Sequence, residues 1–96
     1  MTSKQRAYLR KLASQLRPVV SVGKAGAAPE VVASAAEALE ARELIKVSVL
    51  DNCFDDVRDV ANMMGERTRS EVVEVKGRKF VLYKPNRKKP VIELPR

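Results

Sequence analysis

A lysine lies between two glycines in the segment Gly23-Lys24-Ala25-Gly26, which we call the glycine loop. Glycine has no Cβ and tolerates positive φ, so the backbone of this segment can come close to a partner. The lysine adds a mobile positive charge. The loop also lies just before a helix expected to open at Pro29, and amide groups at a helix N-terminus favour anions. The segment is therefore a candidate site for a phosphate group.

The same glycine spacing also occurs in ordinary turns between a strand and a helix, and the spacing alone does not decide between a turn and a binding site. No Gly-Lys-Ser/Thr follows, so the segment is not a P-loop. The third glycine and the ribose-binding acid of a dinucleotide fingerprint are also missing. The phosphates of a nucleic-acid backbone are the anions that the rest of the chain favours.

Positive charge is concentrated at the two ends of the chain. Residues 1–26 hold six basic residues and no acid, whereas residues 27–75 hold five basic and eleven acidic residues. Residues 76–96 hold eight basic residues and one acid, which gives the chain of 96 residues a net charge of +7. An excess of this kind suggests a polyanionic partner. We expect the two basic ends and the glycine loop to converge into a single pocket.

Composition excludes several classes of protein. The chain has no apolar run of about 18 residues, so no membrane span is expected, and its N-terminus lacks the apolar core of a secretory signal. The one cysteine, Cys53, cannot form an internal disulfide and suits a reducing cytoplasm. Histidine is absent, which removes the commonest general base and metal ligand. We expect a cytoplasmic monomer with no cofactor or metal, and not an enzyme.

Two alternatives to nucleic-acid binding stay open. An enzyme acting on RNA or phosphate esters could hold Mg²⁺ with the acidic residues Asp51, Asp55, Asp56 and Asp59. Helix capping and a solvated helix face explain the same residues and are favoured. A protein adaptor could instead use the basic surface to dock an acidic partner.

The residue patterns predict seven elements in one domain over residues 1–96, with a basic tail over 86–96. In chain order we expect a helix over 2–17, a strand over 18–22, a helix from 29, a strand over 44–50, a helix over about 54–64 that ends before Gly65, and strands over 71–76 and 79–84. Residues 91–94 are a possible final extended piece. Strand–helix–strand units give parallel neighbours and the closing hairpin adds an antiparallel edge. The fold class is therefore α/β, a small mixed four-stranded sheet with three helices.

Apolar spacing predicts which faces of the helices are buried. In the first helix Tyr8, Leu12 and Leu16 recur every four residues, and Leu9 and Ala13 widen the stripe. Three glutamates of the second helix are expected to face solvent: Glu37, Glu40 and Glu43.

Aromatic residues are few, so the sequence offers no evident stacking platform for bases. Phe54 and Phe80 are expected in the core. Tyr83 is expected in the core or at its rim, with stacking on a base as the lesser alternative.

Three segments in suitable order resemble the CRM domain, an RNA-binding module of chloroplast splicing and ribosome maturation proteins. They are Leu16–Gly26, Arg42–Val47 and Gly77–Pro85, and the resemblance covers nearly the whole chain. The nearest type is the stand-alone bacterial YhbY-type member. The resemblance implies a fold similar to the C-terminal domain of translation initiation factor three. It also implies association with ribosomal RNA in precursors of the large ribosomal subunit, and so a role in ribosome assembly.

The family resemblance also implies that the glycine loop contacts RNA, much as the GxxG loop of KH domains does. Many relatives have Asn before the second glycine and a larger apolar residue after it, whereas this chain has Ala25 and Ala27. The change puts base-specific contact in doubt and leaves contact through backbone amides intact. The residues expected to bind RNA are Gly23, Lys24, Ala25, Gly26, Lys4, Arg6, Arg10, Lys11, Arg17, Arg78, Lys79, Lys84, Arg87, Lys88 and Lys89.

Overall fold

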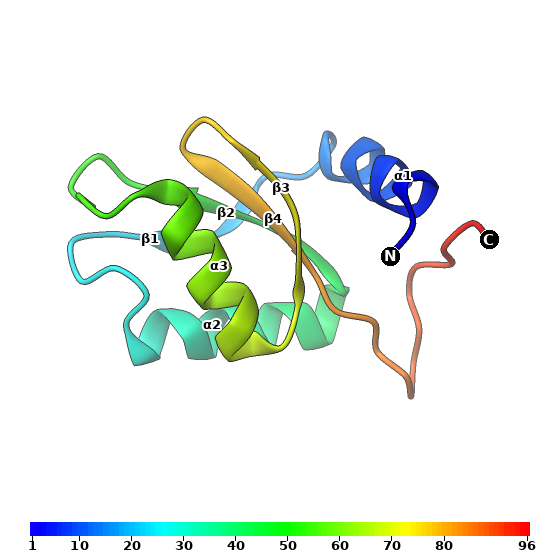
Figure 1. The fold of residues 1–96 in the computed structure, drawn as a ribbon. Helices are drawn as coiled ribbons and strands as arrows, with labels where there is room; N and C mark the ends of the chain where they lie inside the picture. The colour runs from blue at the N-terminus through cyan, green and yellow to red at the C-terminus, as the bar shows by residue number, and fades with distance from the viewer.

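The computed structural model describes all 96 residues and places a four-stranded sheet between two layers of helices (Figure 1). The elements, in chain order, are α1 Ser3–Ala13, β1 Pro18–Val22, α2 Pro29–Arg42, β2 Leu44–Val49, α3 Val57–Thr68, β3 Glu71–Lys76 and β4 Lys79–Tyr83. The order and the α/β class agree with the sequence prediction. None of the three helices is long and apolar enough to span a bilayer.

Strand pairing gives the sheet two distinct ends. The strand order is β1-β2-β4-β3, with β1 and β2 parallel and the other two pairs antiparallel. Val22 pairs with Val49, and Ser48 pairs with Lys79, so the segments 23–28, 50–56 and 76–79 lie together at what we call the loop end. Leu44 pairs with Tyr83, so residues 42–44, 68–71 and 83–96 lie at the opposite, tail end.

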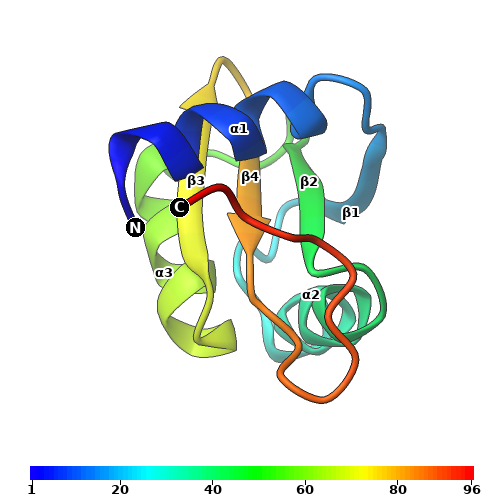
Figure 2. The same cartoon turned by 90° about the vertical axis from the view of Figure 1, so that its right-hand side faces the viewer.

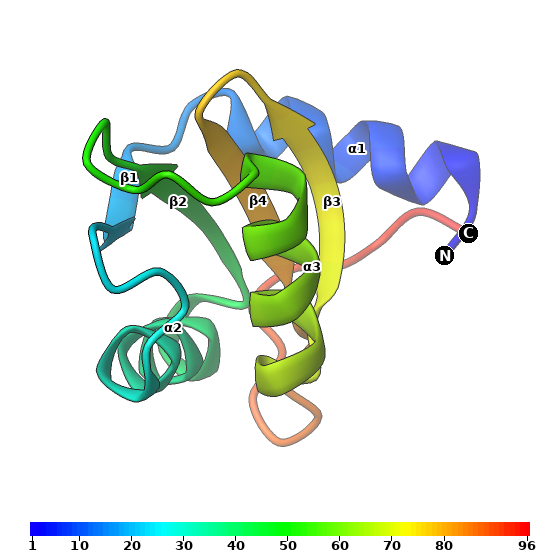
Figure 3. The ribbon, with the colours of Figure 1, turned by 60° about the vertical axis from the view of Figure 1, so that its left-hand side comes forward.

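Each sheet face has its own apolar cluster. Helices α2 and α3 cover one face, where Leu39, Val47 and Phe80 are among the fully buried side chains. Helix α1 lies across the other face over Leu44 and Tyr83, on the opposite side of the sheet from α2 and α3 (Figure 3). Because α1 covers only part of that face, the sheet near the loop end stays open on the α1 side.

Helix α1 begins as predicted and ends one turn early. The Thr2 hydroxyl accepts from the Gln5 amide while the Gln5 side chain accepts from the Thr2 amide, which completes a capping box. The predicted end at Arg17 is wrong, since the helix stops at Ala13. Proline at 18 disfavours helical backbone in the residue before it, and residues 14–15 form a turn that leads into an extended segment.

Helix α3 begins later and ends later than the sequence predicts. Asp56 is its N-cap and accepts hydrogen bonds from the Arg58 and Asp59 amides, so Phe54 lies outside the helix. The helix does not end at Gly65. That glycine is buried, and a Cβ there would lie 2.9 Å from the Val72 Cγ2 atom, so it lets the helix pack closely on β3.

Glu43 was expected to face solvent and is instead 0% exposed, which corrects the sequence prediction. It caps the C-terminus of α2 with a φ of 65°, and this backbone turns its side chain toward the C-terminal segment. Its carboxylate accepts hydrogen bonds from the backbone amides of Asn86, Val91 and Ile92. One carboxylate therefore holds the C-terminal segment against the sheet.

Burial by itself raises the pKa of the Glu43 carboxyl, but the hydrogen bonds from the Asn86, Ile92 and Val91 amides together outweigh burial and lower that pKa below its usual range. Burial, with the nearby Glu43 charge, also raises the pKa of the Tyr83 hydroxyl. Because its pKa is lowered, the Glu43 carboxylate is ionised in the folded protein at neutral pH.

Candidate nucleic-acid interface

The glycine loop forms a tight turn that leaves several amides free. The Gly26 amide donates to the Gly23 carbonyl at 2.9 Å, and the Ala28 amide donates to the Gly26 carbonyl at 2.8 Å. The amides of Lys24 and Ala25 have no hydrogen-bond partner within the chain, and both residues are exposed. The N-cap of α2, Ala28, supplies no side-chain bond to the first turn. Free amides of the loop are thus followed in the chain by a helix N-terminus without a side-chain cap, an arrangement that suits an anion.

The two glycines of the loop have different roles. Gly26 has a φ of 65° and is buried, and a Cβ on it would lie 2.7 Å from an Asp55 Oδ2 atom. Gly23 has no positive φ, and its nearest neighbour for a Cβ is the Asn52 Oδ1 atom at 3.4 Å. The positive φ therefore favours glycine at position 26, whereas the backbone at position 23 tolerates a small side chain.

Residues 50–56 form a second segment at the loop end, next to the glycine loop, and hydrogen bonds from Arg78 hold this segment in place. Its guanidinium donates to the carbonyls of Val49 at 3.1 Å, Leu50 at 2.8 Å and Cys53 at 3.0 Å. Asp51 pairs with the same guanidinium at 3.8 Å. Arg78 was predicted to contact RNA; its Nε and Nη2 donors brace this segment, and Nη1 has no hydrogen-bond partner within the chain.

A group of lysines lies on the open sheet face at the loop end. Lys46, Lys76 and Lys79 surround a hollow of about 240 Å³ that also contains Glu74. Lys76 and Lys79 pair directly across the hairpin, and like charges in such a position repel. An anion here would relieve the repulsion. Of these three lysines, only Lys79 was predicted from the sequence to bind RNA. Strand alternation placed Lys46 off the core face, but it did not show that Lys46 lies near Lys76 and Lys79, because the sequence does not specify which strands are neighbours.

Helix α1 contributes exposed cations and one structural arginine. Lys4, Arg10 and Lys11 are exposed, as is Arg17 after the helix. Arg6, which was predicted to contact RNA, donates to the carbonyls of Val72 at 2.7 Å and Val73 at 2.9 Å, where the register of β3 shifts. Arg6 therefore ties α1 to β3.

The two ends of the chain do meet, as expected, but the glycine loop is not with them. The Gln5 side chain donates to the Pro95 carbonyl at 3.0 Å, and Figure 2 shows the C-terminal segment beside α1. The expectation of a single pocket is wrong, because β4 runs antiparallel to β2 and delivers the tail to the end where β2 begins. The two ends of β2 are about 17 Å apart at the usual rise of a strand, and Figure 1 shows the loop and the termini on opposite sides.

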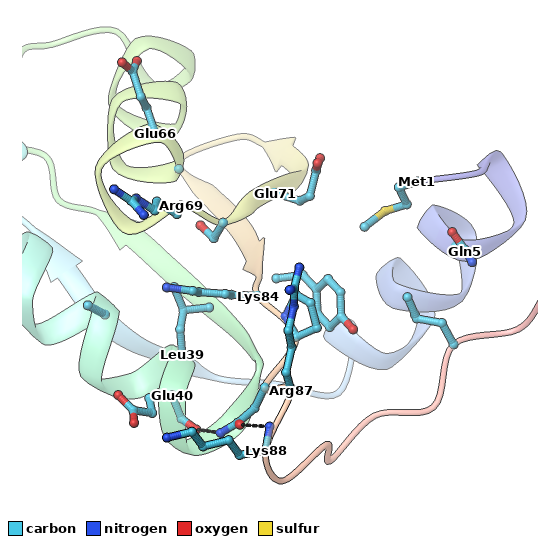
Figure 4. Close-up of a pocket in the computed structure, with 17 residues that line it drawn as sticks. Met1, Gln5, Leu39, Glu40, Glu66, Arg69, Glu71, Lys84, Arg87 and Lys88 are labelled. Atoms are coloured by element: carbon cyan, nitrogen blue, oxygen red, sulfur yellow. Dashed lines mark hydrogen bonds between the residues drawn. The ribbon is translucent and has the colours of Figure 1, made fainter.

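The tail end carries a hollow of about 1040 Å³ that is lined by charged side chains of both signs (Figure 4). The Lys84 ammonium, predicted to contact RNA, donates to the Thr68 carbonyl at 3.1 Å. The other charged residues of the lining are Arg69, Arg87, Lys88, Glu40, Glu66 and Glu71. Carboxylates lie among the cations here, and Asp51, Asp55 and Asp56 likewise lie among the cations of the loop end, so charge alone does not separate the two ends. The last predicted cation, Lys89, is exposed beside this hollow.

The acidic residues considered for Mg²⁺ have separate positions. Asp56 caps α3, Asp51 pairs with Arg78, and Asp55 lies against Gly26. No group of three or more His, Cys, Asp or Glu side chains could hold a metal ion.

The aromatic residues divide differently from the prediction. Phe80 and Tyr83 are 1% and 4% exposed and belong to the core, as expected. Phe54 was also expected in the core, and that prediction is wrong, since the side chain is 91% exposed. The Asp56 cap starts α3 at Val57, so the position of Phe54 falls in the loop instead of on the apolar face of the helix.

Comparison with known proteins places the chain in a family. The model of the CRS1/YhbY (CRM) domain matches residues 1–84. The chain is 47% identical to "Probable RNA-binding protein YqeI" of Bacillus subtilis over 99% of both chains. It is 34% identical to an "RNA-binding protein" of Haemophilus influenzae over 100% of this chain and 96% of the relative. The solution structure of the hypothetical protein SAV1595 from Staphylococcus aureus superposes with a TM-score of 0.83 at 43% identity, over 99% of both chains. The chain therefore belongs to the CRS1/YhbY (CRM) domain family.

Proposed function

We propose that this protein binds RNA and that it does so mainly through the loop end. Relatives that match nearly the full chain are named as RNA-binding proteins. The observation that carries the proposal is the pair of free amides at Lys24 and Ala25 beside an α2 N-terminus without a side-chain cap. A phosphate placed there receives backbone hydrogen bonds and the Lys24 charge together.

The other exposed cations extend this site electrostatically. Lys79, with Lys76 and Lys46, offers positive charge across the end of the sheet. The cations of α1 and of the tail, Lys4, Arg10, Lys11, Arg17, Arg87, Lys88 and Lys89, add a diffuse positive potential to a chain of net charge +7. Such a potential attracts a phosphate backbone without reading its sequence.

The RNA partner we propose is ribosomal RNA in a precursor of the large ribosomal subunit, as the family resemblance implies. The protein acts there as an assembly factor and not as an enzyme, a monomer in the cytoplasm that holds RNA without catalysis. Sedimentation of cell extracts tests this role, because the protein should travel with large-subunit precursors and leave them after RNase treatment. A protein adaptor would stay bound after RNase treatment, and that result would contradict the proposal.

Binding of single-stranded RNA to two charge-reversal variants tests the site. Lys24→Glu should weaken binding by about tenfold or more at low salt, because it removes one phosphate contact and adds a repulsive charge. Arg42→Glu is the matched control, since Arg42 is exposed in the last turn of α2 at the tail end and the change in net charge is the same. Equal losses of RNA affinity for the two variants would show that the glycine loop is only part of a diffuse basic surface and not a specific site.

Salt dependence gives a second readout of the same contact. Neutralised phosphates release counterions, and on single strands the log–log slope of affinity against salt changes by about 0.7 for each phosphate contacted. Lys24→Ala should make this slope shallower by about that amount. An unchanged slope would remove Lys24 from the interface.

A further inference from the structure

Phe54 is the most exposed large apolar side chain of the protein, at 91%, against 65% for Val91. Its ring makes no contribution to either apolar cluster. A fully exposed aromatic ring gains nothing from the fold, and in RNA-binding proteins such rings provide surfaces on which unpaired bases stack.

Phe54 lies close in the chain to residues that contact the glycine loop. Its neighbours in the chain contact the glycine loop on both sides, since Asn52 lies next to Gly23 and Asp55 lies against Gly26. Leu50, itself exposed, also reaches Gly23. Phe54 therefore lies in the chain between two residues that contact the glycine loop, and its ring is exposed on the same end of the sheet.

The backbone that carries Phe54 is anchored before and after it. Before it, the Cys53 side chain is buried and its carbonyl accepts a hydrogen bond from Arg78 at 3.0 Å. After it, Asp56 caps α3 and fixes the start of that helix. Cys53 and Asp56 are both held in place by the fold. When a base stacks on Phe54, little besides the Phe54 ring has to become ordered, and the entropic cost of binding is therefore low.

We propose that Phe54 stacks on an unpaired base of the RNA whose phosphate lies on the glycine loop. This rests on the proposed function and adds a base contact to it. Charge sets the orientation of the strand: Asp55 and Asp56 directly follow Phe54 and repel phosphates, whereas Lys24 attracts them, so the phosphate lies at Lys24 and Ala25 and not at Gly26, against which Asp55 lies. The sugar–phosphate chain therefore follows Lys24, and the uncharged base turns toward the Phe54 ring.

The proposed contact selects unpaired RNA without selecting a base. Every base has a face that can stack, and Ala25 has no side-chain group to read a base edge. The protein should therefore prefer single-stranded segments over duplexes of the same length and show little preference among uniform sequences.

Fluorescence anisotropy with a labelled single-stranded RNA of mixed sequence tests the contact. Phe54→Ala should weaken binding by about tenfold, and Phe54→Leu, which keeps apolar area without a planar ring, should recover little of it. Phe54→Trp should bind at least as tightly as the wild type. Val91→Ala is the matched control, an exposed apolar side chain at the tail end, and should leave affinity unchanged. Thermal unfolding of all four variants should match the wild type, because neither side chain is buried.

Phe54→Trp also reports the stacking directly, because the chain has no other tryptophan. RNA should quench its fluorescence, and an RNA with abasic sites should bind without quenching it. If the wild type binds RNA in a Lys24-dependent way while Phe54→Ala binds equally well, the stacking contact is wrong and the proposed function stands. If the wild type does not bind RNA, both fail. Self-association that Phe54→Ala abolishes, with no effect on RNA, would make this patch a contact between copies and overturn the proposal.

Discussion

The two ends of the sheet use polar groups in opposite ways. At the tail end Glu43 accepts three backbone amides, Lys84 donates to the Thr68 carbonyl and Gln5 donates to Pro95, so polar groups there are spent on joining segments of the chain. At the loop end the Lys24 and Ala25 amides stay free and a phenylalanine is exposed. Basic charge alone does not locate a binding site, because both ends are basic and only the loop end combines free amides with the N-terminus of α2.

Glu43→Gln should have the largest effect on stability and should separate the two ends most clearly. The amide group of glutamine places a donor where the buried carboxylate accepts hydrogen bonds, so at least one backbone amide loses its partner. We expect a loss of about 3 kcal/mol in the free energy of unfolding, measured by urea denaturation. The folded fraction should bind RNA as tightly as the wild type, and weaker binding by folded protein would place the tail end in the interface.

The two glycines of the loop should respond unequally to alanine. Gly26→Ala should lower the free energy of unfolding by about 2 kcal/mol, because alanine is strained at this positive φ. Gly23→Ala should change it by less than about 0.5 kcal/mol. Chemical denaturation of both variants checks this, and equal losses would show that the turn is not built as described. Any loss of RNA affinity in Gly23→Ala then reports a contact with RNA and not damage to the fold.

Arg78→Lys tests whether Arg78 serves the loop end as a brace. A lysine cannot reach the three carbonyls that the guanidinium bridges, although it keeps the charge. We expect a loss of about 1 kcal/mol in unfolding free energy and faster amide hydrogen exchange in residues 50–56. Unchanged exchange there would mean that Arg78 is free to act as a binding residue.

Acid should loosen the tail end before it affects the loop end. The folded-state pKa of Glu43 lies below its unfolded value, so its contribution to stability is present above the usual glutamate range and is lost as pH falls through the lowered pKa. The wild type should therefore lose more stability on acidification than Glu43→Gln does. Parallel pH profiles for the two proteins would show that Glu43 is not the group responsible.

Local signals predicted much of the fold. Apolar periods of two and of about 3.6 residues, together with the Thr2–Gln5 capping box, gave the element order and most boundaries. The predicted start of α3 was wrong because two local signals compete there. The apolar spacing extends back to Phe54, whereas the Asp56 side chain caps the helix.

Other features depend on long-range contacts that the sequence does not show. Glu43 looks like a solvent residue at helical spacing, and its partners are 43 or more residues further along the chain. Likewise, Arg6, Arg78 and Lys84 look like free cations until the carbonyls that they bind are placed beside them. The glycine loop was identified from residue types, but its distance from the tail depends on strand order, which no local pattern specifies.

We expect RNA to contact the loop end and to leave the tail end unbound. Backbone amide chemical shifts of the labelled protein, followed by NMR during titration with a short single-stranded RNA, test it most directly. The amides of Lys24 and Ala25 should shift most, while those of Asn86, Val91 and Ile92, already bound to Glu43, should stay in place. Large shifts at these three tail amides, with no shift at Lys24 and Ala25, would show that RNA binds the tail end and not the loop end.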